Sequence, residues 1–245
     1  PEVLKGQPES WAWLLSPAMK GRSAFQDDAA MGTIDAAIAI NAAGLAEFKN
    51  PSNLTLSEID LLIKLLKGKK DQGQFVEFWK DHEQSVNLLK SQRSYIQSIW
   101  APMYYSNRCN IDGYKLACPI EGYRAWCGGL SVSKCASGKK LDMVYQYLNW
   151  WLSGWPGSVI AKQGYYISNT ESVKNYLSEE EWQFWYEGKP ALKVLNGIDD
   201  HPLIPEGTVR SGGSYTQRMS NIAVWNSVMD EHNYLVRKWR ELTKV

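Results

Sequence analysis

Apolar side chains recur at helical spacing along several stretches of the chain. We predict a first helix that begins at Ser57 and ends before Gly68, because glycine often follows the last turn of a helix. Further helices are predicted over residues 75–89 and 141–152, and a long one over residues 219–242. The apolar stripes of the first and third helices are formed by Ile59, Leu62, Ile63 and Leu66, and by Leu141, Val144, Tyr145, Leu148, Trp151 and Leu152.

Shorter apolar segments between these helices favour extended structure. The predicted strands are residues 96–100, 113–118 and 124–133. The Pro-Ile-Glu-Gly sequence at 119–122 is typical of a turn, and Ser178 with Glu181 forms a capping box that predicts a short helix. The alternation of helices and strands indicates an α/β fold.

The charges of the chain are nearly balanced and evenly mixed. The 27 basic and 26 acidic residues give a formal net charge of +1 without a basic stripe, so we expect no nucleic-acid partner. The longest apolar run, residues 36–45, is interrupted by Asn41 and Gly44 and is too short to span a bilayer. The chain opens with Pro1-Glu2-Val3 and has no signal-peptide pattern, and we expect its N-terminus to be truncated or processed.

Tryptophan and tyrosine dominate the aromatic residues. The chain has 12 Trp and 13 Tyr but only 5 Phe. Trp and Tyr combine a large apolar face with a polar tip, which suits ligand pockets and interfaces as well as cores. We expect most of the Trp side chains to pack in cores and a minority to face a ligand.

Four cysteines lie within 27 residues of one another, at positions 109, 118, 127 and 135. No Cys-x-x-Cys spacing occurs and the histidines lie elsewhere in the sequence, so we predict no zinc site. An even, clustered count favours disulfides in an oxidising compartment, although four reduced thiols remain an alternative. We favour the pair Cys109–Cys118, which flanks a turn at Asp112-Gly113. Cys127 and Cys135 are disfavoured as a pair, because a straight strand would hold them about 26 Å apart.

The sequence lacks the usual patterns of a catalytic site. Ser211-Gly212-Gly213-Ser214 is glycine-rich, but it has neither the phosphate-loop pattern nor a preceding strand. No Gly-x-Ser-x-Gly elbow is present, and the three histidines are isolated from one another. We therefore predict no enzyme activity, no catalytic residue, no metal and no cofactor.

An ordered series of short motifs extends along nearly the whole chain. In chain order they are Ser10-Trp11-Ala12-Trp13-Leu14-Leu15, Met19-Lys20-Gly21-Arg22, Phe25-Gln26-Asp27-Asp28, Ile99-Trp100, Pro119-Ile120-Glu121-Gly122 followed by Arg124-Ala125-Trp126, the helical stretch 141–152, and Gly164-Tyr165-Tyr166-Ile167-Ser168-Asn169. Each motif alone is short, but their order and spacing together resemble the periplasmic polyamine-binding proteins. These are the spermidine/putrescine-type receptors of ABC importers.

This resemblance implies a two-lobed clamp of the periplasmic-binding-protein type, with the ligand in the cleft. Residues 1–127 and 174–245 would form the second lobe, and residues 128–173 would make an excursion into the first lobe. Family members carry a longer segment before the Ser-Trp motif, so we expect most of the first lobe to be absent from this chain. The excursion would then expose an apolar face, and we expect another part of the protein, or self-association, to cover it.

The resemblance also implies a set of ligand-binding residues. Trp100, Trp126 and Tyr165 match the family's aromatic positions, and Asp28 matches an acidic one. Aromatic faces attract ammonium groups by roughly 0.5–2 kcal/mol per ring, and carboxylates pair with them. The alternatives are core packing for the two tryptophans and helix capping for Asp28.

Two departures from the family pattern concern the ligand. Met31 and Gly128 stand where spermidine receptors have acids, so only one acid of this part of the site is retained. An ammonium group buried without an acid is unfavourable, which makes spermidine itself doubtful. Arg124 and Arg210 would instead allow a carboxylate to be held by two parallel hydrogen bonds, unless both are solvated surface residues.

We therefore expect a secreted, periplasmic or extracellular solute-binding protein. Its partners would be a small ligand, polyamine-like or another small amine, and the membrane permease of an ABC importer. The alternatives are the same fold binding an amino acid or a small carboxylate, and a sensory binding domain without transport.

Overall fold

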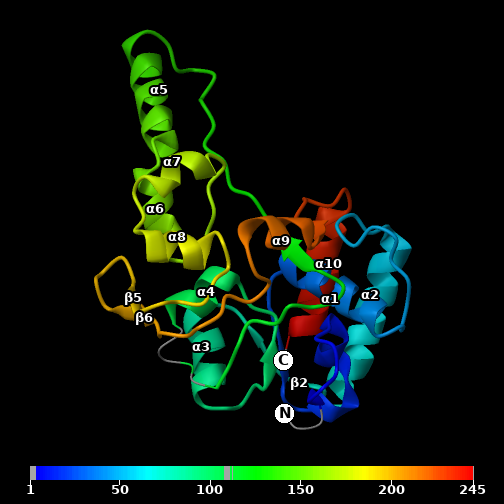
Figure 1. Ribbon diagram of the computed structural model, residues 1–245. Helices are drawn as coiled ribbons and strands as arrows, with labels where there is room; N and C mark the ends of the chain where they lie inside the picture. Colours follow the sequence, from blue (N-terminus) through cyan, green and yellow to red (C-terminus); the bar gives the residue numbers. More distant parts are fainter. Residues whose placement is uncertain (1–3, 108–110, 112, 245) are drawn as a thin grey trace. The chain divides into compact units, whose positions relative to one another are not determined.

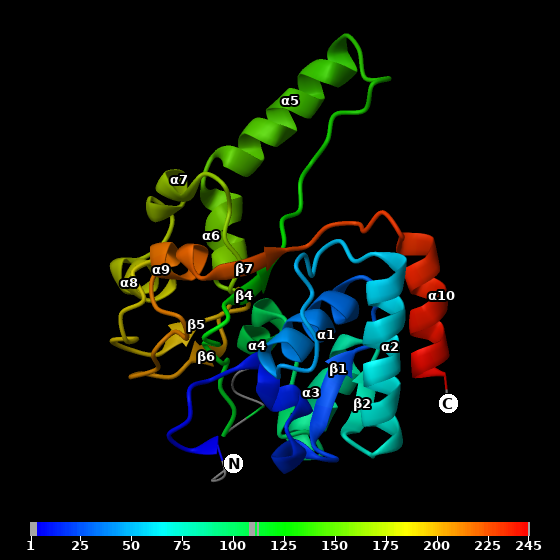
Figure 2. The same cartoon turned by 90° about the vertical axis from the view of Figure 1, so that its right-hand side faces the viewer.

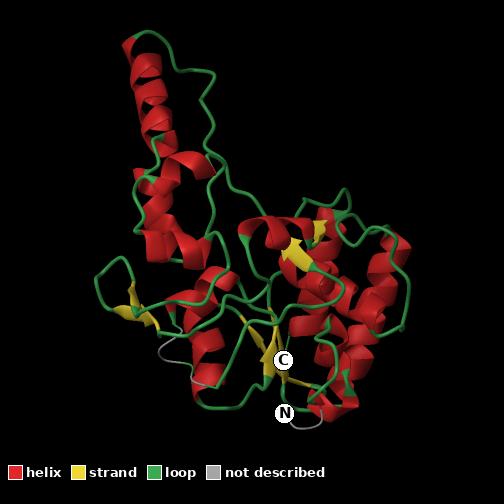
Figure 3. Ribbon diagram, viewed as in Figure 1, coloured by secondary structure: helices red, strands yellow, loops and turns green. Residues whose placement is uncertain are grey.

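The computed structural model of the protein describes residues 4–107, 111 and 113–244. The chain is an α/β protein in which helices predominate over short, mainly parallel strands (Figures 1 and 3). It divides into two compact units. Unit 1 contains Pro1–Ile99, Ile111–Trp126 and Ser220–Val245, and unit 2 contains Trp100–Asn110 and Cys127–Met219. No helix in the described ranges combines the length and apolar character needed to cross a bilayer.

Unit 1 is built around a parallel sheet with strand order β2-β1-β3, beside a separate parallel pair, β4-β7. Figure 2 shows helices α2 and α10 of this unit lying side by side, and the two pack together. The elements of unit 1 are the 3-10 helices η2 (Trp11–Leu15) and η3 (Pro17–Met19), the strands β1 (Ser23–Gln26), β2 (Phe75–Trp79), β3 (Ile96–Gln97), β4 (Tyr123–Ala125) and β7 (Ile222–Trp225), and the helices α1 (Met31–Ala42), α2 (Leu56–Asp71), α3 (His82–Lys90) and α10 (His232–Thr243).

Helix α1 is the centre of the core of unit 1. Every residue from position 32 to position 40 is buried, so the helix contacts protein on all sides. The aromatic rings of Phe25, Phe78 and Trp239 continue this core, with ring centroids 6.5 Å apart for the two phenylalanines and 6.2 Å apart for Phe78 and Trp239. Each fully buried aliphatic or Phe side chain contributes roughly 1.5–3 kcal/mol to the stability of such a core.

Unit 2 is mainly helical and has one antiparallel pair of short strands. Its elements are α4 (Ala101–Ser106), α5 (Lys139–Leu152), α6 (Trp155–Ala161), α7 (Thr170–Lys174), α8 (Glu179–Trp185), β5 (Leu195–Asn196), β6 (Pro202–Ile204) and α9 (Tyr215–Ser220), whose last residue belongs to unit 1. Phe184, Trp185 and Tyr186 are buried and contribute large side chains to its core. None of the residues of α5 is buried.

Several features predicted from local patterns are found in the structure. Helices α2 and α5 lie where they were expected, although Gly68 is inside α2 and does not end it. Ser178 and Glu181 make the reciprocal hydrogen bonds of a capping box at the start of α8. The Pro-Ile-Glu-Gly turn is closed by a hydrogen bond of 3.0 Å from the Gly122 N–H to the Pro119 carbonyl.

Two of the predicted helices are wrong. Residues 75–79 form strand β2, which pairs with β1, and the helix after it begins only at His82, where the Asp81 side chain accepts a hydrogen bond from the Gln84 N–H. The region 219–242 likewise contains strand β7 before α10. The predicted strand at 124–133 stops at Ala125, and residues 113–118 form no strand.

The units differ from the expected division of the chain. The chain leaves unit 1 after Trp126 and returns to it after Met219, and residues 100–110 also belong to unit 2. Residues 174–219 therefore pack with the segment 127–173, whereas the sequence interpretation placed them with residues 1–127.

The tight packing at the start of α1 makes a prediction about Gly32. A Cβ atom at this position would lie 2.5 Å from the Gln26 carbonyl oxygen and 2.7 Å from a ring atom of Trp239. We expect Gly32→Ala to destabilise the protein by about 1–3 kcal/mol in urea unfolding, because the backbone or the indole must shift. Gly68→Ala is the matched control. A Cβ atom at position 68 has no contact within 4 Å, so this helical substitution should stabilise by up to about 1 kcal/mol. Equal effects of the two changes would contradict this account.

Candidate functional site

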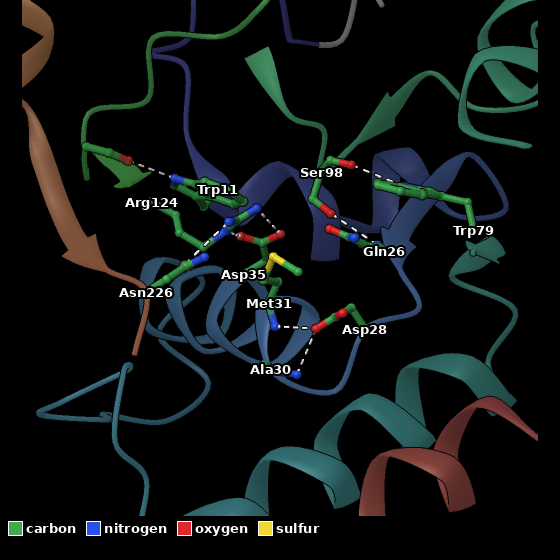
Figure 4. A network of polar contacts seen from close by, with 11 residues as sticks. Trp11, Gln26, Asp28, Ala30, Met31, Asp35, Trp79, Ser98, Arg124 and Asn226 are labelled. Atoms are coloured by element: carbon green, nitrogen blue, oxygen red, sulfur yellow. Dashed lines mark hydrogen bonds and ion pairs between the residues drawn. The ribbon is translucent and has the colours of Figure 1, made fainter. Parts of the chain in front are cut away.

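Two of the sequence motifs, more than 100 residues apart, contact each other in unit 1. The Glu121 carboxylate accepts hydrogen bonds from the Ser10 hydroxyl and from the Trp11 backbone N–H, the latter at 3.2 Å. The Trp11 indole N–H donates to the Gly122 carbonyl at 2.9 Å (Figure 4). The Pro-Ile-Glu-Gly turn thus anchors the start of η2, and strand β4 begins directly after that turn.

A polar network lies at the carboxyl end of β1, where the parallel strands of unit 1 end. The Gln26 N–H donates to the Ser98 hydroxyl at 3.2 Å, and the Trp79 indole N–H donates to the Ser98 carbonyl at 3.2 Å (Figure 4). Ser98 thereby ties the end of β3 to those of β1 and β2. Ligands of open α/β sheets bind outside this edge, so a ligand site is expected beside these residues.

Asp28 stands at this edge and caps helix α1. Its Oδ1 atom accepts hydrogen bonds from the backbone N–H groups of Ala30 at 2.9 Å and Met31 at 2.8 Å (Figure 4). Helix capping was the alternative to a ligand-binding role. The described hydrogen bonds of this carboxylate use Oδ1, and Oδ2 takes part in none of them.

Arg124 binds a carboxylate through two hydrogen bonds, but the carboxylate is the protein's own Asp35. The Arg124 Nε–H donates to Asp35 Oδ1 at 2.5 Å, and Nη2 donates to Oδ2 at 3.4 Å. The two side chains are only 6% and 0% exposed. Arg124 Nη1 also donates to the Asn226 side chain at 3.4 Å (Figure 4). The alternative of a solvated surface arginine is therefore wrong for Arg124.

The buried pair has a shifted titration. Burial raises the pKa of the Asp35 carboxyl, because the charged form loses its hydration. The charge and hydrogen bonds of Arg124, together with a hydrogen bond from Ser98, oppose this effect and favour the carboxylate, whereas nearby Asp28 raises the pKa further. Asp35 and Asn226 were missed by the sequence interpretation, although a single acid within the apolar stretch 34–40 is a signal for a buried basic partner.

The aromatic candidates fall in different units. Trp126 directly follows β4 in unit 1, and its side chain is 39% exposed. Trp100 and Tyr165 belong to unit 2, where both are half-buried. Trp100 precedes α4, and the Tyr165 N–H donates to the Ile160 carbonyl at 3.2 Å. The structure thus groups Asp28, Arg124 and Trp126 in one unit, and the remaining candidates in the other.

Arg210 is buried inside unit 2 among aromatic rings. Its guanidinium donates to the carbonyl oxygens of Trp185 and Gly164, the latter at 3.2 Å, and its Cζ atom lies 4.7 Å from the centroid of the Tyr166 ring. No carboxylate of the described residues pairs with it, and burial lowers its pKa. With 1% of its surface exposed, Arg210 is neither a solvated surface residue nor accessible to a ligand.

The cysteines do not form disulfides among the described residues. Cys118, Cys127 and Cys135 are exposed free thiols. Cys109 lies outside the described residues, so the Cys109–Cys118 pair stays a prediction. No three His, Cys, Asp or Glu side chains cluster as metal ligands within the described ranges.

A surface cavity of about 430 Å³ lies elsewhere in unit 1 and contains none of the predicted site residues. It is lined by residues 53–57, by Asp230 and by Glu231, at the N-termini of α2 and α10. The acids of this cavity are those expected near helix N-termini, where the backbone dipoles favour negative charge. We therefore place the candidate site at the carboxyl end of β1 and not in this cavity.

Comparison with known proteins adds no further assignment. No family model matches the chain, and no curated protein matches it either. The resemblance to polyamine-binding proteins therefore rests on the sequence motifs alone.

The Asp35–Arg124 pair makes a prediction about pH. Arg124→Met removes the charge and the hydrogen bonds that hold the pKa of Asp35 down. The pKa of Asp35 in the folded chain then rises further above its value in the unfolded chain. The protonated form then supports folding only at low pH, and stability is lost as the pH rises through the folded-state pKa. We expect a destabilisation of about 3–5 kcal/mol at neutral pH and less in mild acid, measured by urea unfolding.

Two controls separate this effect from a loss of packing. In the double variant Asp35→Asn, Arg124→Met the additional pH dependence should disappear. Lys238→Met breaks the exposed pair with Asp60 and should have little effect at either pH. Equal destabilisation of Arg124→Met in acid and at neutral pH would show that the Asp35 charge is not responsible.

Arg210 makes a prediction about unit 2. Arg210→Met leaves the Gly164 carbonyl without its guanidinium donor and the Trp185 carbonyl with only the Tyr166 hydroxyl at 3.4 Å, at about 1–3 kcal/mol for the lost donor, and it removes the cation–π contacts. We expect a clearly lowered melting temperature and altered Trp fluorescence near Trp185. Arg93→Met, at an arginine whose side chain is 58% exposed, should leave both unchanged. A similar small effect of both substitutions would contradict the structural role of Arg210.

Proposed function

We propose that the protein is an extracytoplasmic solute-binding protein of the two-lobed clamp type, which delivers a small amine to an ABC importer. The observation that carries the proposal is the placement of the candidate residues after parallel strands. Asp28 follows β1 and Trp126 follows β4, while Trp100 comes three residues after β3 in the chain. Carboxyl ends of parallel strands are where open α/β folds bind small ligands.

The chain path also supports a clamp. Each unit has its own core, and the chain passes between the units several times, at residues 99–100, 110–111, 126–127 and 219–220. The contact of Ser10 and Trp11 with Glu121 and Gly122 joins motifs that are distant in the sequence. In this proposal unit 1 corresponds to the second lobe, and segment 128–173 to the excursion toward the first lobe.

The polar contacts favour a cationic ligand over a carboxylate. Arg124 is already paired with Asp35, and Arg210 is buried against carbonyls and rings, so neither is available to a ligand acid. Asp28 keeps one oxygen outside its described capping bonds, and Trp126 is exposed enough to stack on an alkylammonium group. A single acid of this kind suits one ammonium group, such as that of a monoamine or one end of a diamine.

Asp28→Asn tests this ligand class. The Asn side chain keeps the Oδ1 acceptor that caps α1 and removes only the charge, so the helix should remain intact. We expect calorimetric binding of a small amine from a panel of putrescine, spermidine, monoamines, amino acids and dicarboxylic acids to weaken by about 1.5–3 kcal/mol.

Asp60→Asn, at an exposed position of α2 that pairs with Lys238, serves as the charge-matched control and should leave the affinity unchanged. Unchanged affinity in both Trp126→Ala and Tyr165→Ala would show that the site lies elsewhere. Binding of a dicarboxylic acid that is insensitive to Asp28→Asn would favour the carboxylate alternative.

A further inference from the structure

Helix α5 of unit 2 exposes a stripe of large side chains. Met143, Tyr147 and Trp150 follow one another at spacings of four and three residues, and they are 67%, 52% and 43% exposed. Because these spacings place side chains on one face of a helix, the three form a continuous surface, which we call the α5 stripe. Figures 1 and 2 show α5 standing apart from the other helices of its unit, with α6 and α7 near its C-terminal end.

The aromatic part of the α5 stripe is organised before any partner binds. The Tyr147 and Trp150 rings are stacked at 5.7 Å with an interplanar angle of 20°, and Trp150 also contacts Trp155 at 5.8 Å. A helix of 14 residues without a buried side chain is marginal by itself, and exposed apolar patches of this kind mark interaction sites.

The basic residues of α5 stand at the end of the helix that disfavours them. Its first turn, where the helix dipole is positive, holds Lys139 and Lys140 together with one favourable acid, Asp142, and no side chain caps this end. The last turn carries no basic residue, although cations are favourable there. Asp142 is the only acid in the sequence between residues 127 and 161.

We propose that the α5 stripe is a docking surface for α5 of a second copy of this chain, in antiparallel orientation about a two-fold axis. An antiparallel partner brings the lysines of each copy to the C-terminal end of the other helix, where the dipole is negative and the indole rings of Trp150 and Trp155 attract cations. Charge complementarity is thus achieved at both ends by one symmetric contact.

The register follows from the spacing of the stripe. With Tyr147 at the two-fold axis, Met143 of each copy lies opposite Trp150 of the other, which allows a sulfur–aromatic contact. Lys139 and Lys140 then lie opposite the segment Gly154–Trp155 of the second copy. The spacing of four and three residues is that of side chains in paired helices.

An anionic lipid surface fits α5 less well. The lysines are confined to the N-terminal end, and Asp142 lies beside them. Tyr145 and Leu152, which are 53% and 45% exposed, lie on another side of the helix, so that a flat surface would not cover all the exposed apolar side chains.

Sedimentation velocity of the full chain over a concentration series tests the proposal. We expect a reversible monomer–dimer equilibrium that Trp150→Ala weakens about tenfold or more, because the stacked rings of the stripe are lost. The double variant Lys139→Glu, Lys140→Glu should also weaken the dimer about tenfold, since each copy would place acids at the negative end of its partner helix. The two new glutamates stand in the first turn of α5, where negative charge stabilises a helix. Circular dichroism of the monomer should therefore show no loss of helix.

Lys64→Glu, Lys67→Glu on exposed positions of α2 is the matched control and should dimerise as the wild type does. Ser153→Lys should weaken its own dimer, because the new lysine lies opposite the first-turn lysines of the second copy. Mixing Ser153→Lys with the Lys139→Glu, Lys140→Glu variant should restore a heterodimer, which identifies the antiparallel arrangement.

A wild-type chain that stays monomeric throughout the series would overturn the proposal. So would dimers that survive both the Trp150 and the lysine substitutions unchanged. Co-sedimentation of a monomeric chain with vesicles of phosphatidylglycerol, and not with vesicles of phosphatidylcholine, would assign the α5 stripe to a lipid surface instead.

Discussion

The buried ion pair of Asp35 and Arg124 is the contact on which the architecture of unit 1 depends. It joins the central helix α1 to strand β4, and through Asn226 to the segment that follows β7. A carboxylate in the middle of an otherwise apolar helix is unfavourable unless a cation pairs with it in close geometry. The pair therefore restricts how the sheet β4-β7 can lie against α1, and it engages the Arg124 guanidinium within the protein.

Unit 2 holds its buried cation in a different way. Arg210 contacts two carbonyl oxygens and the faces of aromatic rings, without a carboxylate among the described residues. The high frequency of Tyr and Trp in this part of the chain is partly explained by these ring contacts. Both arginines thus belong to internal packing, and neither faces solvent.

The same aromatic residues serve two purposes in unit 2. Trp185 and Tyr166 surround a buried charge, whereas the rings on α5 stack on one another at the surface. These two groups of rings differ in their neighbours. Backbone carbonyls and the Arg210 guanidinium surround Trp185 and Tyr166. The charges nearest in sequence to the α5 rings are lysines and the single acid Asp142.

The sequence by itself determined the features that depend on neighbouring residues: helix α2, helix α5, the capping box at Ser178 and the turn closed by Gly122. Only the structure showed that Asp28 follows β1 and that Trp126 follows β4. Only the tertiary structure decided that residues 75–79 and 222–225 are strands, because their hydrogen-bond partners lie in β1 and β4, far away in the sequence. The roles of Asp28, Arg124 and Arg210 were decided there as well, since a polar side chain binds whichever partner the fold brings within reach, and local spacing does not reveal that partner.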